Sequence, residues 1–212
     1  MVFDCDSTLV AIEGIDELAE GVHDEVRALT DLAMDGRVPL EEVYGRRLAL
    51  IRPSRARVEA LGREYVAALV PGARETVAAL RALGREVRVV SGGLAPAVEA
   101  VAAELGIAPA QVAAVGVRFD DAGGYLGFDE GSPLARTDGK AEVLRGWALP
   151  GPVLLVGDGA TDLEARPAVD AFAAFVGVAE RAAVAGAAEF VLRDLREVLE
   201  VACSAEELAR LG

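Results

Sequence analysis

The sequence predicts an α/β protein with a parallel sheet that is covered by helices on both faces, and a small helical insert after the first strand. From residue 71 onward, helix-like and strand-like segments alternate, which is typical of a parallel sheet. Hydrophobic residues make up 53% of the 212-residue chain, enough for a sizeable core. We therefore expect a core domain of residues 1–12 and 70–212, and a helical cap of residues 13–69.

The first strand is short and leads directly into an acidic string. Residues 1–3 favour a strand, and Asp4 and Asp6 follow it. Because residues i and i+2 of an extended segment face the same side, these two carboxylates project together. Cys5 between them points away, and we expect it to pack in the strand rather than to act as a reactive thiol.

Residues 14–68 are expected to form several short helices. Apolar residues recur there at helical spacing, and Gly36, Pro39 and Pro53 interrupt the pattern. The only histidine, His23, falls in this segment, where a surface position on a cap helix is a better explanation than catalysis.

The next strand is predicted at residues 86–90 and is followed by Ser91, Gly92 and Gly93, then by a helix over residues 94–105. A strand that leads through such a loop into a helix offers a hydroxyl and several free N–H groups to an anion. Taken alone, a Ser-Gly-Gly string is most often an ordinary loop.

Two further elements precede the second acidic cluster. A turn at residues 121–124 predicts a hairpin that pairs residues 115–119 with residues 125–128. Lys140 then opens an amphipathic helix that ends near Trp147, and its ammonium group could neutralise phosphate charge, although a lone lysine is most often simply solvated.

The second acidic cluster follows the apolar run of residues 153–156, which is typical of a strand buried on both faces. Gly157 and Gly159 bracket Asp158, and Asp162 lies at the start of a predicted helix. Either acidic cluster alone could equally be a solvated turn or a helix N-cap. Together, at the carboxyl ends of neighbouring strands, they predict a Mg²⁺ site built from carboxylate oxygens.

Composition excludes several classes of function. A net charge of −14 argues against a nucleic-acid partner, because a phosphate backbone needs a basic surface. No apolar run approaches the roughly 20 residues of a membrane span, and no signal peptide is recognisable. The two cysteines form no framework, which favours a reducing cytoplasm, and we expect a monomer or a homodimer.

Several strings in this chain resemble the haloacid-dehalogenase-like phosphatases, which have a Rossmann-like core. Four strings match the catalytic motifs of that family in order: D-C-D-S-T (4–8), S-G-G (91–93), G-K (139–140) and G-D-G-A-T-D (157–162). Segments outside those motifs resemble the branch that acts on phosphoserine: E-G-I-D-E-L-A (13–19), R-L-A-L-I-R-P-S (47–54) and G-F-D-E (127–130).

The resemblance implies roles for the acidic residues. Asp4 would be the nucleophile that forms an aspartyl-phosphate, and Asp6 the general acid and base. Mg²⁺ would be held by the Asp4 carboxylate, the Asp6 backbone carbonyl and Asp158, with Asp162 orienting the outer shell.

The resemblance also implies how the substrate is bound. Ser91, the Gly92 N–H and Lys140 would bind the phosphoryl oxygens, and Gly93 and Thr161 would be further substrate-binding residues.

The remaining substrate contacts would come from the cap. Glu13 would receive the ammonium group and Arg47 the carboxylate of O-phospho-L-serine, and Met34 would close the pocket. Asp35 and Leu40 lie where relatives often carry glycine and an aromatic residue.

The expected activity is therefore Mg²⁺-dependent hydrolysis of O-phospho-L-serine, the last step of serine biosynthesis. Two alternatives remain open at this point. The same intermediate could serve hydrolysis or transfer with another small phosphomonoester, or the protein could be a non-catalytic relative that binds a phosphorylated metabolite.

Overall fold

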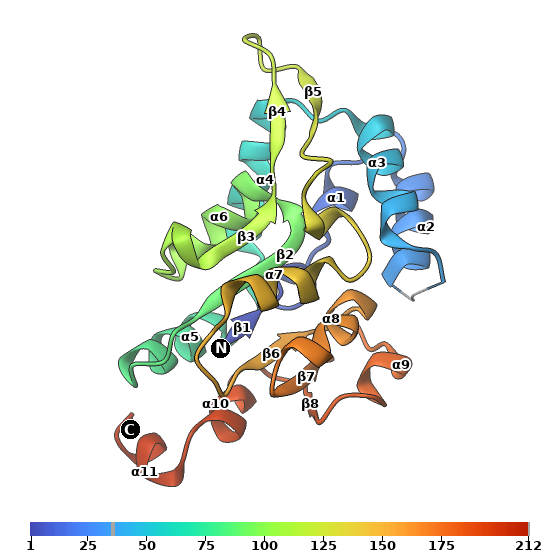
Figure 1. Ribbon diagram of the computed structural model, residues 1–212. Coiled ribbons are helices and arrows are strands. Elements are labelled where there is room, and N and C mark those ends of the chain that lie inside the picture. The colour runs from blue at the N-terminus through green and yellow to red at the C-terminus, as the bar shows by residue number, and fades with distance from the viewer. Residues whose placement is uncertain (35–36, 212) are drawn as a thin grey trace.

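The computed structural model describes residues 1–34 and 37–211, so that Asp35 lies outside the described residues (Figure 1). A six-stranded parallel sheet in the order β3-β2-β1-β6-β7-β8 forms the centre, and helices flank it. The sheet strands are β1 (Val2–Phe3), β2 (Arg88–Leu94), β3 (Val112–Val115), β6 (Leu154–Gly157), β7 (Ala171–Phe175) and β8 (Phe190–Leu192). The predicted α/β fold is confirmed.

The helices occupy the connections between these strands. Four α-helices lie between β1 and the core helix α5: α1 (Gly14–Glu17), α2 (His23–Met34), α3 (Leu40–Ile51) and α4 (Arg55–Ala67). The others are α5 (Ala73–Ala82), α6 (Ala95–Glu104), α7 (Gly139–Trp147), α8 (Ala160–Ala165), α9 (Ala182–Ala185), α10 (Glu197–Ala202) and α11 (Ala205–Ala209). Short 3-10 turns occur at Pro109–Gln111, Pro133–Ala135 and Arg166–Ala168. No helix within residues 1–34 and 37–211 is long and apolar enough to cross a membrane.

Strand β1 lies at the middle of the sheet and determines where the acidic string emerges. Phe3 pairs with Val89 of β2 on one side and with Val156 of β6 on the other, all in parallel. The Asp4 amide still donates to the Val156 carbonyl at 2.9 Å, so the ladder continues up to the first carboxylate. Chain order reverses at β1, because β2 and β3 extend the sheet on one side and β6 on the other, which creates a crevice at the carboxyl ends of these strands.

The predicted run of short helices between β1 and β2 is present. Pro39 is the N-cap residue of α3, and Pro53 lies between α3 and α4. His23 is the first residue of α2 and is exposed, as expected. An isolated bridge between Val10 and Leu69 ties the two ends of the insert together.

The helices of the insert pack in two different ways. Helix α2 packs against α3, whereas α4 packs against α6 of the core. The division into a core and a cap of residues 13–69 therefore stays a prediction.

Strand β2 differs from its predicted extent. It begins at Arg88 rather than Glu86 and continues through Leu94, so that residues 91–93 belong to the strand. Pairing with β3 accounts for this extension, because Val90 pairs with Ala113 and Leu94 pairs with Val115. Residues 91–93 of β2 form an irregularity in the register between these two pairs.

The predicted hairpin is also displaced at one end. Val115 ends β3 of the main sheet, and the hairpin consists of β4 (Val117–Phe119) and β5 (Tyr125–Phe128). The hairpin projects from the top of the molecule as drawn in Figure 1, and β5 contacts α3 of the insert.

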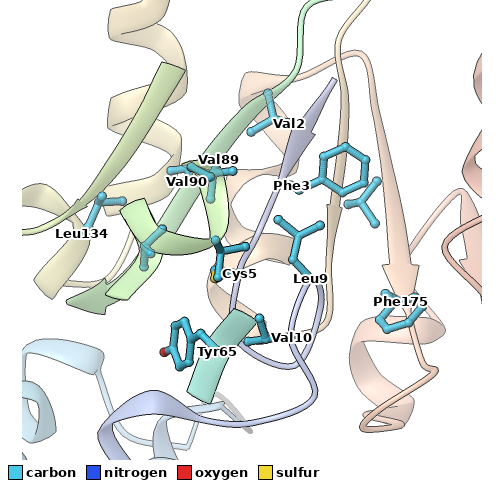
Figure 2. Packing of buried hydrophobic residues seen from close by; sticks show 14 of the residues in the cluster. Val2, Phe3, Cys5, Leu9, Val10, Tyr65, Val89, Val90, Leu134 and Phe175 are labelled. Carbon is cyan, nitrogen blue, oxygen red and sulfur yellow. The ribbon is translucent and has the colours of Figure 1, made fainter. Parts of the chain in front are cut away.

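The core is centred on β1. Val2, Phe3 and Cys5 are completely buried, together with Val89 of β2 and Tyr65 of α4 (Figure 2). The expectation that Cys5 packs in the interior is confirmed, and burial raises the pKa of its thiol well above the ordinary value. A buried β1 makes a rigid support for the carboxylates that follow it.

Candidate active site

The first acidic residues leave β1 through a constrained turn. Asp4 is buried at the end of the strand, and Ser7 adopts the left-handed conformation with φ of 51°. In that conformation the Ser7 hydroxyl donates to Glu13 Oε1 at 2.6 Å, which links the turn to the start of α1. The turn therefore positions three carboxyl groups, those of Asp4, Asp6 and Glu13, around one cavity.

The second acidic cluster leaves β6 at the same edge of the sheet. A β-carbon at Gly157 would overlap the Asp162 carboxylate, so this glycine makes room for an acidic residue. Asp162 is completely buried and accepts a hydrogen bond from the Gly159 amide at 3.0 Å. The Thr8 hydroxyl donates to Asp158 Oδ1 at 3.1 Å, which joins the two acidic clusters directly.

Lys140, at the start of α7, bridges the two clusters. Its Nζ lies 2.9 Å from Asp4 Oδ1 and 2.6 Å from Asp162 Oδ1, and the side chain is buried. Burial alone would lower the pKa of Lys140, but the neighbouring Asp162 and Asp4 carboxylates outweigh it and raise the pKa above its ordinary value. Lys140 is therefore a permanent positive charge in the crevice.

Three carboxylates can share one metal ion. Oxygen atoms of Asp4, Asp158 and Asp162 lie within 4.8 Å of one another, and all three residues are buried. Burial raises the pKa of Asp4 well above its ordinary value and that of Asp158 to about 7, the neighbouring carboxylates adding to the effect. Such a crowded, desolvated donor set of hard oxygens fits a divalent cation, whose charge would offset the repulsion.

The bulged segment of β2 faces the same crevice. Ser91 is completely buried, and its Oγ lies 3.3 Å from Asp6 Oδ2 while accepting a hydrogen bond from the Gly93 amide at 2.9 Å. A β-carbon at Gly93 would come within 2.9 Å of Asp6 Oδ2, so glycine is needed for this approach. The Gly92 carbonyl accepts a hydrogen bond from Tyr44 of α3 at 2.7 Å, which ties the insert to the core.

Glu13 and Arg47, the two predicted contacts for an amino acid, both line this crevice, where Arg47 is buried and Glu13 is half-buried. Burial, together with Asp6 and Asp158, raises the pKa of Glu13 to about 8. The Arg47 side chain is 3% exposed and donates through Nη1 to the Thr30 hydroxyl at 2.9 Å. Its Nε is buried without an acceptor among the described residues, so the guanidinium has donor capacity to spare.

One cavity connects nearly all of the predicted site residues. Its lining consists of Asp4, Asp6, Glu13, Ile15, Leu40, Tyr44, Arg47, Ser91, Gly92, Gly93, Leu134, Arg136, Lys140, Asp158 and Thr161. Asp162 lies behind this lining, in contact with Lys140. Met34 is the last residue of α2, and its contact with a substrate stays a prediction.

The structure adds residues that the sequence did not indicate. Arg181, in the connection between β7 and α9, forms an ion pair with Asp158 and lies 3.9 Å from Glu13. Tyr65 of α4 donates its hydroxyl to Asp6 Oδ1. Burial and the Asp6 carboxylate raise the pKa of Tyr65 well above its ordinary value, so the phenol keeps its proton.

Comparison with known proteins agrees with this geometry. Residues 1–166 match the family described as haloacid dehalogenase-like hydrolase. The chain is 43% identical over 202 residues to the phosphoserine phosphatase of Bos taurus, a match that covers 93% of this chain and 90% of that protein.

Solved structures of phosphoserine phosphatase also resemble this fold. A phospho-aspartyl intermediate analogue has a TM-score of 0.80 and 31% identity, and the match covers 94% of this chain and 96% of that one. A substrate-bound complex has a TM-score of 0.82 and 29% identity, with the same coverage of 94% and 96%.

Proposed function

The chain belongs to the haloacid dehalogenase-like hydrolase family, and from its site and its relatives we infer that it is a phosphoserine phosphatase, which hydrolyses O-phospho-L-serine to L-serine and phosphate. The observation that carries this conclusion is a single cavity in which two kinds of group meet. Asp4, Asp6 and Lys140 suit phosphoryl transfer, while Glu13 and Arg47 offer opposite charges to an amino acid. The 43% identity with a phosphoserine phosphatase over most of both chains supports the same assignment.

We propose Mg²⁺ as the cation of the carboxylate cluster. The Asp4 and Asp158 carboxylates and the Asp6 backbone carbonyl would hold the ion, and Asp162 would fix Lys140 and the loop amide beside it. When bound, the ion would neutralise charge on the phosphoryl oxygens and draw Asp4 into its ionised form. Arg181, which pairs with Asp158, would remain beside the site as a further positive charge.

The residues of the cavity divide the reaction into two displacements. An oxygen of Asp4 attacks phosphorus, the bond from phosphorus to the serine oxygen breaks, and Asp6 gives its proton to that oxygen. Water then attacks the aspartyl-phosphate and Asp6 removes its proton, so that the bond to Asp4 breaks and phosphate leaves. Throughout, the Ser91 hydroxyl, the Gly92 amide and Lys140 would bind the phosphoryl oxygens, with Gly93 and Thr161 at the cavity wall.

We propose that the insert selects the substrate. Glu13 would accept the ammonium group and the Arg47 guanidinium would hold the carboxylate through its unused donors. Met34, the last residue of α2, would close the pocket over the serine moiety as part of the proposed cap of residues 13–69. The Tyr44 hydroxyl donates to the Gly92 carbonyl and so links α3 to the phosphate-binding segment.

The cysteines and the small substrate support a proposed cellular location. The two cysteines, Cys5 and Cys203, are free thiols, which fits a reducing cytoplasm and a small metabolite as substrate. We propose a monomer or a homodimer that needs neither nucleic acid nor a membrane.

The test is phosphate release from L-phosphoserine with and without Mg²⁺, compared with phosphothreonine, phosphohomoserine and an aryl phosphate. A strong Mg²⁺-dependent preference for phosphoserine is the expected result. Activity on the aryl phosphate alone would retain the reaction class and refute the substrate. Product phosphate that falls when alcohols are added would indicate transfer, and binding of phosphoserine without any turnover would indicate a metabolite sensor.

A further inference from the structure

Tyr65 contributes a polar group to the active site from within the hydrophobic core. Its side chain is completely buried on α4, and Figure 2 shows the ring beside Val10 in the packed cluster that also contains Cys5. The hydroxyl donates to Asp6 Oδ1. A phenylalanine would satisfy the packing equally well, so the hydroxyl requires a separate explanation.

A second donor reaches the same oxygen. The Gly14 amide, at the start of α1, donates to Asp6 Oδ1 at 2.7 Å. A β-carbon at Gly14 would overlap the Tyr65 hydroxyl, so the first turn of α1 is shaped to admit that group. Tyr65 and Gly14 thus form a two-donor cradle for one oxygen of Asp6, supplied by two helices of the insert.

The other oxygen of Asp6 faces the phosphate-binding segment. Asp6 Oδ2 lies 3.3 Å from Ser91 Oγ, and Gly93 leaves room for it. Two donors converge on Oδ1, so the orientation of the carboxyl is fixed with Oδ2 turned toward the phosphate-binding segment. Oδ2 is the oxygen on the side where the leaving group would lie.

We propose that Tyr65 is a positioning residue for the general acid: with Gly14 it fixes the Asp6 carboxyl so that Oδ2 delivers the proton to the departing oxygen. The inference rests on the proposed function, because it gives Asp6 the role of general acid. Tyr65 is separated from the cavity by Asp6, so its hydroxyl affects the rate of proton transfer and not substrate binding.

The experiment compares Tyr65→Phe with the unmodified protein in the presence of Mg²⁺. With phosphoserine, kcat is expected to fall by about tenfold to a hundredfold while KM changes by less than about twofold, since general acid catalysis depends on geometry. An aryl phosphate has a leaving group that departs without a proton. Its rate of Asp4 phosphorylation, measured by rapid quench, is expected to fall by less than about threefold.

Matched variants separate positioning from a loss of structure. Tyr125→Phe removes a phenol hydroxyl from the hairpin, outside the cavity lining, and is expected to leave both rates unchanged. In an Asp6→Asn background, Tyr65→Phe is expected to cost nothing further, because the group it positions is gone. Gly14→Ala, which displaces the hydroxyl while keeping Tyr65, is expected to reproduce the loss of kcat and serves if Tyr65→Phe fails to fold.

Equal losses with both substrates, or a full additional loss in the Asp6→Asn background, would overturn the inference and leave Tyr65 a structural residue. Failure of the proposed function is seen separately, in the unmodified protein. If the unmodified protein hydrolyses other alkyl phosphates but not phosphoserine, the substrate assignment fails. The comparison of alkyl and aryl leaving groups then still decides the role of Tyr65.

Discussion

Arg47→Met separates recognition of the substrate from the chemistry performed on it. Methionine keeps most of the side-chain length and removes the guanidinium. Arg47 is 3% exposed, and its Nε is buried without an acceptor among the described residues. The Thr30 hydroxyl, which Arg47 contacts, still donates to Asp16 at 2.5 Å, so the packing between α1 and α2 is expected to survive.

The size of the effect follows from this burial. Loss of one partner of a desolvated, hydrogen-bonded charge pair costs about 2–5 kcal/mol. Taking about 3 kcal/mol, kcat/KM for phosphoserine falls roughly 150-fold. Phosphoethanolamine keeps the phosphate and the ammonium group but has no carboxylate to contact Arg47. Its kcat/KM, which is expected to be much lower, should therefore change by less than about threefold in Arg47→Met.

The assay is steady-state phosphate release with both substrates for three proteins: unmodified, Arg47→Met and Arg46→Met. Arg46 is the exposed neighbour on α3, so its replacement removes the same charge without reaching the cavity. Arg46→Met is expected to match the unmodified protein. Equal losses on phosphoserine and phosphoethanolamine for Arg47→Met would refute the role of Arg47 in binding the carboxylate.

Two further predictions concern the carboxylates. Asp4→Asn is expected to abolish phosphate release without lowering the melting temperature, because it removes a buried carboxylate that Asp162 and Asp158 repel; a variant that still turns over would contradict the aspartyl-phosphate. Without metal, the pKa of Asp158 is raised to about 7 and that of Glu13 to about 8, so the folded state binds more protons than the unfolded chain and stability falls as pH rises toward 8. Mg²⁺ binds the ionised carboxylates, so adding Mg²⁺ is expected to raise the melting temperature of the protein more at about pH 8 than at about pH 6 in thermal scans. An equal rise at both pH values would argue against this cluster as the metal site.

The main features of the site could be predicted because they depend on short-range patterns. Apolar runs ending in Asp4 and Asp158 indicate two buried strands, and the rules of parallel sheets bring the carboxyl ends of such strands together. Lys140 could be placed because it lies at the start of an amphipathic helix, and Asp162 because it follows the glycine-bracketed turn after β6. Local sequence therefore indicates which charged groups meet in the cavity.

The parts that could not be predicted depend on tertiary packing. Tyr65 has the sequence pattern of an ordinary buried helix residue, and only the packing of α4 beneath α1 brings its hydroxyl to Asp6. Arg181 reaches Asp158 from a loop whose course the local sequence does not specify. Strand β2 continues through Gly92 and Gly93, which disfavour strands, because Leu94 beyond them pairs again with β3.

The most direct test of the central claim is a single-turnover experiment with O-phospho-L-serine labelled in the phosphoryl group. The unmodified protein, mixed with substrate and Mg²⁺ and quenched in acid within milliseconds, is digested and the labelled peptide is identified. The account predicts a transient acyl phosphate on Asp4 that forms and decays fast enough to account for turnover, and none in Asp4→Asn. Label on Ser7 or Ser91, or phosphate released with no labelled peptide at any time, would contradict it.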